Sequence, residues 1–146
     1  MASVFDVADY VLQRLGKPIT AMKLQKLVYY SQAWSLVWDE KPLFCEKIEA
    51  WANGPVSREL YDAHKGEFEV RAARFNDKGD ASRLAPEQRE TLDAVLDFYG
   101  QKSSHWLSEL THAEQPWKDA RNGLTAGERG NAQITHSSMA EYYGSL

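Results

Sequence analysis

The stretch TAMKLQKLVYYSQAWSLVWDEKPLFCEKIEAWANGPVSRELY, residues 20–61, determines the fold more than any other part of the chain. Its first half predicts a helix that begins after Thr20, a favoured helix-capping residue, and breaks before Pro42. Apolar side chains cover most of the helical wheel, with Trp34 and Trp38 on the main apolar face. Only a narrow stripe is polar, and it consists of Gln25, Gln32, Ser35 and Asp39. Because a helix this apolar belongs in the interior, we expect it to be the centre of the fold.

The second half of the stretch predicts a short strand and a turn. Residues 45–51 alternate roughly between apolar and charged side chains, which favours a strand. Asn53, Gly54 and Pro55 then form a strong turn signal, because glycine permits positive φ and proline cannot continue a strand. We therefore expect a helix from Val56 that ends before Gly66.

The flanking regions predict further helices. Ser3 and Asp6 have the spacing of a capping box, and Gly16 ends the helix that follows. We expect a surface excursion at residues 66–85, with a second short strand at 68–71. Helices are then expected from Pro86 to Gly100 and from Ser103 or Ser104, followed by a connector at 111–124. A last short helix should carry Met139, Tyr142 and Tyr143. The predicted fold class is mainly α (α+β). Residues 1–146 would form a single compact helical domain around the central apolar helix, with one or two short β-strands.

The composition favours a cytoplasmic protein that binds neither membranes nor nucleic acids. The 146 residues contain 17 Lys and Arg against 21 Asp and Glu, a net charge of −4, whereas nucleic-acid-binding domains are usually strongly basic. One cysteine, Cys45, suits a reducing compartment. The N-terminus has no signal-peptide pattern, and no apolar run is long enough to span a bilayer.

The sequence offers few groups for catalysis. Its four histidines lack metal-ligand spacing, and GERG at residues 127–130 lacks the strand and helix of a phosphate loop. We therefore expect no metal, no cofactor and no catalytic residue. Two alternatives stay open: a small enzyme that uses Cys45 with His112, and a DNA-binding regulator in which residues 17–27 form part of a helix-turn-helix.

Four segments resemble the Panacea-domain family of SocA-like antitoxins, which also contains phage-associated proteins of the GepA type. They are KLQKLVYYSQAW (residues 23–34), KPLF (41–44), EAWANGPV (49–56) and THAEQPW (111–117). The match is strong over about residues 4–62 and weaker over 104–121. The resemblance implies an antitoxin, without catalytic residues, that neutralises a toxin encoded by a neighbouring gene through direct contact. One family member resembles an adaptor that delivers its toxin to a AAA+ protease. Many antitoxins also have a DNA-binding domain, for which we see no room here, so autorepression is not expected.

Two segments are candidates for contact with a protein partner. Aromatic and arginine side chains are enriched in interfaces, so we select Trp51, Asn53, Arg58 and Tyr61 around the turn. The excursion supplies the second set, Phe68, Arg71 and Arg74, because loops on a rigid scaffold often determine binding. Two structural roles remain open: Trp51 as a core anchor under the turn, and Arg58 as a solvated helix residue.

Overall fold

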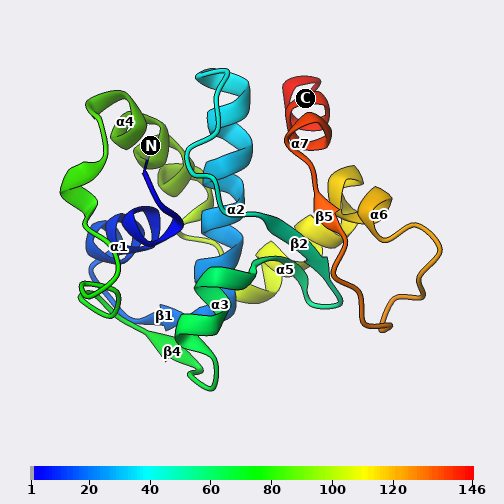
Figure 1. Ribbon diagram of the computed structural model, residues 1–146, viewed down its shortest axis with the longest axis horizontal. Helices are drawn as coiled ribbons and strands as arrows, with labels where there is room; N and C mark the ends of the chain where they lie inside the picture. The colour runs from blue at the N-terminus through cyan, green and yellow to red at the C-terminus, as the bar shows by residue number, and fades with distance from the viewer. Residues whose placement is uncertain (1) are drawn as a thin grey trace.

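Helix α2 (Ala21–Trp38) forms the centre of the computed structural model, which describes residues 2–146. Thr20 caps α2 by accepting a hydrogen bond from the backbone N–H of Lys23. Figure 1 shows α2 in the middle of the molecule, with α1 and α4 on one side and α6 and α7 on the other. The predicted role of this helix as the centre of the fold is confirmed, because thirteen of its side chains are buried.

The remaining helices surround α2, and all but α4 and α6 begin after a residue whose side chain caps the helix. They are α1 (Val4–Leu15), α3 (Arg58–His64), α4 (Pro86–Tyr99), α5 (Ser104–Ala113), α6 (Gln115–Ala120), α7 (His136–Gly144) and the 3-10 helix η1 (Ala81–Arg83). The capping box of α1 forms as predicted, since Ser3 and Asp6 exchange hydrogen bonds between side chain and backbone. Gly16 ends α1 in the left-handed conformation.

Short antiparallel strands make two small sheets. They are β1 (Ile19–Thr20), β2 (Ile48–Trp51), β3 (Gly54–Ser57), β4 (Glu69–Val70) and β5 (Gln133–Ile134). Strand β1 pairs with β4, and β2 lies between β3 and β5. The predicted class, mainly α (α+β), is confirmed, although residues 2–146 contain five short strands rather than one or two.

The turn at Asn53 is a β-hairpin, which corrects the prediction of a helix from Val56. Pro55 lies in β3 opposite Ala50, and α3 begins only at Arg58, after the capping residue Ser57. Strand β3 is at the edge of its sheet, where a proline that lacks an N–H is tolerated. The edge position of β3 follows from its pairing with β2 alone, which the local sequence at Pro55 does not reveal.

The aromatic end of α2 is less buried than predicted. Trp38 is 50% exposed, and the ring of Trp34, which is half-buried, stacks on it with centroids 4.9 Å apart. A helical wheel predicts which face is apolar but not how far neighbouring elements extend along it. The predicted connector at residues 111–124 is also wrong in part, because α5 runs on to Ala113 and α6 follows.

Three residues of the polar stripe of α2, Gln25, Gln32 and Ser35, are buried and bind the backbone of later segments. Gln32 accepts hydrogen bonds from the N–H groups of Leu43 (2.7 Å) and Phe44 (3.3 Å) and donates one to the Phe44 carbonyl (2.9 Å). Ser35 donates to the carbonyl of Lys41 at 2.8 Å. The segment after α2 is therefore fixed to the helix that precedes it.

Gln25 holds the hairpin and α3 in the same way. Its side chain accepts from the N–H of Ser57 at 2.9 Å and donates to the Ser57 carbonyl at 3.2 Å. The amide nitrogen of Gln25 also donates to Nε2 of His64 at 3.0 Å. Through these contacts α2 determines where the Asn53 turn lies.

Candidate functional site

Asn53, at the tip of the β2–β3 hairpin, separates two hollows on the surface. The first has a volume of about 460 Å³, and we call it the arginine hollow; it is lined by Trp51, Ala52, Asn53, Arg58, Arg129, Gly130 and Asn131. The second has a volume of about 560 Å³, and we call it the histidine hollow; it is lined by Tyr61, His64, Phe68, His105 and His112 among others, and again by Asn53. We refer to the two hollows together as the Asn53 face.

The structure brings five of the seven candidate residues to this face. Trp51, Asn53 and Arg58 line the arginine hollow, while Tyr61 and Phe68 line the histidine hollow. Whether these residues bind a partner stays a prediction. Their grouping means that one partner surface of ordinary size could contact them all.

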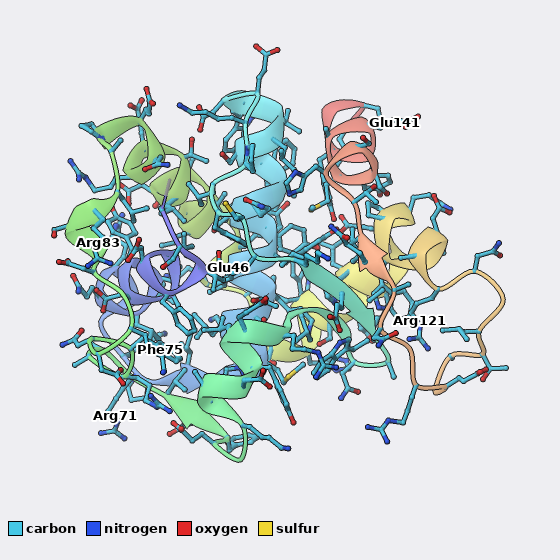
Figure 2. The ribbon with its side chains drawn as sticks, in the orientation of Figure 1. Glu46, Arg71, Phe75, Arg83, Arg121 and Glu141 are labelled. Carbon is cyan, nitrogen blue, oxygen red and sulfur yellow. The ribbon has the colours of Figure 1, made fainter. Side chains whose placement is uncertain are left out.

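Arg71 and Arg74 are not part of the two hollows. Arg74 forms an ion pair with Glu67 at 2.6 Å and donates to the carbonyl of Ala63, so it holds its own segment. The hydrogen bonds from Arg74 also keep the pKa of the Glu67 carboxyl below its ordinary value. Arg71 is exposed and lies at the opposite end of the molecule from Arg121, as Figure 2 shows.

Trp51 has the structural role that the sequence left open, and its contact with a partner stays a prediction. Its ring is half-buried and packs edge-on against Tyr61, with centroids 4.8 Å apart. The guanidinium carbon of Arg58 lies 5.2 Å from the centroid of the Trp51 ring, within the range of a cation–π interaction. Glu49 accepts a hydrogen bond from the Trp51 indole at 2.8 Å and lies 3.5 Å from Arg58. Trp51 is therefore an anchor whose ring also borders the arginine hollow.

The sequence did not reveal the second wall of the arginine hollow, which is the loop between α6 and β5. Arg121 is buried and donates to the carbonyls of Ala50 (3.1 Å), Thr125 (3.1 Å) and Glu128. Figure 2 shows Arg121 between the end of β2 and this loop. Trp117 adds a hydrogen bond from its indole to the Trp51 carbonyl at 2.8 Å.

Gly130 allows this loop to close on the hairpin. A Cβ at this position would lie 2.5 Å from Cδ1 of Leu124 and 3.2 Å from a guanidinium nitrogen of Arg121. Gly130 of the GERG motif therefore has a packing reason, whereas a Cβ on Gly127 would meet no atom within 4 Å. The packing of Gly130 against Leu124 and Arg121 could not be predicted, because no local pattern in the sequence shows that these residues meet.

A buried lysine lies beneath the turn. Lys26 is 0% exposed, and within residues 2–146 its Nζ has no hydrogen-bond partner. Burial lowers the pKa of Lys26 to about 8, because the charged form loses its hydration. A Cβ on Gly54, which has φ of 122°, would lie 2.6 Å from Cε of Lys26. Glycine at position 54 thus serves both the backbone conformation and the packing of this lysine.

His112 lines the histidine hollow, and the centroid of its ring lies 4.3 Å from that of the Trp117 ring. Burial, followed by the charges of Lys26 and Arg121, lowers its pKa, so the ring is neutral at pH 7. Cys45, the proposed catalytic partner, is exposed and lines neither of the two hollows of the Asn53 face. The geometry therefore gives no support to a Cys45–His112 pair.

Two other kinds of site, a metal centre and a membrane-spanning helix, are not present in residues 2–146. No three His, Cys, Asp or Glu side chains come together in a way that could hold a metal ion. None of the described helices has both the length and the apolar character needed to cross a bilayer.

Comparison with known proteins identifies the family. The model of the family described as "Antitoxin SocA-like, Panacea domain" matches residues 24–118, which include most of α2, the Asn53 hairpin and Trp117. The chain is 30% identical to antitoxin SocA of Caulobacter vibrioides (strain NA1000 / CB15N), and the alignment covers 80% of this chain and 69% of the relative. No solved structure matches the chain. The chain belongs to the SocA-like antitoxin family that is defined by the Panacea domain.

Proposed function

We propose that this protein is an antitoxin that neutralises a cognate protein toxin, encoded by a neighbouring gene, through direct protein–protein binding. The observation that carries the proposal is the 30% identity to antitoxin SocA over 80% of the chain. Neutralisation would require no catalysis and no cofactor, and it would take place in the cytoplasm, where toxin and antitoxin are made.

The Asn53 face is the surface that we assign to the toxin. A stable interface buries about 800 Å² on each partner, and its centre is usually rich in aromatic and arginine side chains. Trp51, Arg58 and Tyr61 give the face this composition. The hairpin that carries Asn53 is fixed through Ser57 to Gln25 of α2, so the surface needs little reorganisation on binding.

The burial of α2 argues against the alternative of a DNA-binding regulator. In a helix-turn-helix the second helix lies in the major groove with polar side chains toward the bases. Here Lys23 and Lys26, the basic residues of α2 in that segment, are both buried. With a net charge of −4 the chain also lacks the basic excess that would hold it on a phosphate backbone.

Co-expression tests the proposal. The neighbouring gene alone should arrest growth, and expression of this chain together with it should restore growth and give a complex that purifies as one species. A version of the gene with an early stop codon is the control for effects of the RNA. If no neighbouring product is toxic and none forms a complex, the proposal fails.

The same strains test whether the antitoxin also acts as an adaptor for proteolysis. In that case the toxin would be degraded faster when this chain is present, and deletion of one AAA+ protease would abolish the difference. An unchanged toxin half-life in all strains would exclude the adaptor role and leave neutralisation by binding.

A further inference from the structure

We propose that the arginine hollow receives a carboxylate side chain, Asp or Glu, of the toxin. This inference rests on the proposed function and specifies the chemistry of its interface. It concerns two guanidinium groups, those of Arg58 and Arg129, which come from different parts of the chain and line the same hollow.

The hollow has an excess of positive charge in a chain whose net charge is −4. Arg129 is exposed and forms no ion pair with any residue in the range 2–146. Arg58 has a side chain 50% exposed, and Glu49 at 3.5 Å offsets its charge only in part. Glu128 does not line the hollow, and its carboxylate accepts hydrogen bonds from Thr125 within its own loop. The hollow therefore has two positive charges, Arg58 and Arg129, and within residues 2–146 Glu49 is the one carboxylate that pairs with either of them.

The walls of the hollow are fixed before any partner arrives. Arg121 holds the loop that carries Arg129 through the carbonyls of Thr125 and Glu128, and it holds β2 through the carbonyl of Ala50. The N–H of Ala50 also donates to the Ala132 carbonyl at 2.8 Å. On the other wall, the Trp51 ring restrains the guanidinium of Arg58. Prior ordering of this kind lowers the entropy cost of binding.

The donors around the hollow suit a carboxylate. A guanidinium group presents parallel N–H donors that match the two oxygens of a carboxylate, and such charged hydrogen bonds are stronger than neutral ones. The amide groups of Asn53 and Asn131 make no side-chain hydrogen bond within the described residues, so both can donate to a ligand oxygen. A protein carboxylate fits better than a nucleic acid, because the acidic chain as a whole repels a polyanion.

Titration calorimetry with the purified product of the neighbouring gene tests the inference. Arg129→Glu should raise the Kd by about thirtyfold or more, the effect of losing a desolvated charge pair. Arg58→Glu should weaken binding in the same direction, and Arg129→Lys should keep part of the affinity because it keeps the charge. Lys17→Glu makes the same change of charge at an exposed site between α1 and β1 and should leave the Kd unchanged.

A charge swap identifies the partner group. Exposed Asp and Glu residues of the toxin are changed one at a time to Arg, and one of them should restore the affinity of the Arg129→Glu variant. Weakened binding that no toxin substitution restores would contradict a carboxylate ligand. A Kd unaffected by both Arg129→Glu and Arg58→Glu would overturn the inference while leaving the antitoxin function intact. By contrast, failure of the unmodified chain to bind would overturn the proposed function itself.

Discussion

The polar stripe of α2 and the Asn53 face contain similar side chains but use them differently. In the stripe, Gln25 and Gln32 bind backbone groups of the hairpin and of residues 43–44, and both are buried. On the Asn53 face, Asn53 and Arg129 are exposed and bind no other side chain in residues 2–146. Polar groups in the first region therefore stabilise the fold, whereas those in the second are available to a partner.

The largest loss of stability is expected when Gln32, a residue of the polar stripe, is replaced. Gln32→Ala would leave the N–H groups of Leu43 and Phe44 and the Phe44 carbonyl without their partner. Because each unsatisfied buried group costs about 1–3 kcal/mol, the free energy of unfolding should fall by about 4 kcal/mol in a denaturant titration. Gln101→Ala, at an exposed position, should change it by less than about 0.5 kcal/mol. A loss below about 1 kcal/mol at Gln32 would show that the stripe does not hold the segment.

Lys26 is also buried in α2, but unlike Gln25 and Gln32 its polar group has no hydrogen-bond partner within residues 2–146, so its replacement should increase stability. Its pKa of about 8, compared with 10.5 for an unperturbed lysine, corresponds to a cost of about 3 kcal/mol at pH 7. Lys26→Met keeps the length and apolar character of the stem without the charge. We therefore expect an increase in the free energy of unfolding of about 2–3 kcal/mol at pH 7. A destabilised variant would mean that the ammonium group has a partner that compensates its burial.

The pH dependence of stability offers a second test at Lys26. Between pH 8 and 10 the unfolded chain keeps the Lys26 proton while the folded chain releases it, so stability rises with pH. The free energy of unfolding of the unmodified protein, relative to that of Lys26→Met, should rise by about 1 kcal/mol per pH unit between pH 8 and 9.5. Above pH 10 the buried tyrosines, whose pKa values are raised by burial, act in the opposite direction. A constant difference between the two proteins over this window would contradict the depressed pKa of Lys26.

The smallest effect on stability is expected on the Asn53 face. Arg129→Glu changes an exposed side chain without an ion pair, so the free energy of unfolding should change by less than about 0.5 kcal/mol. Thermal and denaturant unfolding measure this directly. A loss of several kcal/mol would mean that Arg129 belongs to the fold and would remove the contrast between the two regions.

Elements with local signals were predictable from the sequence. The caps at Ser3 and Thr20 and the left-handed Gly16 depend on neighbouring residues, so the start of α1, its end and the start of α2 could be predicted. The apolar wheel of α2 likewise predicts its central position. Trp51 and Arg58, selected because aromatic and arginine side chains are enriched in interfaces, do lie together in the arginine hollow, and their contact with a partner stays a prediction.

Features that depend on distant residues could not be predicted. The burial of Gln25 becomes understandable only once Ser57 is known to lie beside it. Strand β5 exists because it pairs with β2, and Arg129 reaches the hollow because Arg121 holds its loop. These contacts join residues far apart in the chain, and no local pattern encodes them.

Hydrogen exchange of the chain alone and in complex with its toxin tests most directly where the partner binds. We predict slower exchange at residues 51–61 and 127–131, which form the hairpin and loop of the Asn53 face. Exchange should be unchanged around Trp38 and Phe98, exposed aromatic residues of α2 and α4 that line neither hollow. Protection confined to those two positions, with none at residues 51–61, would contradict the assignment of the Asn53 face to the toxin.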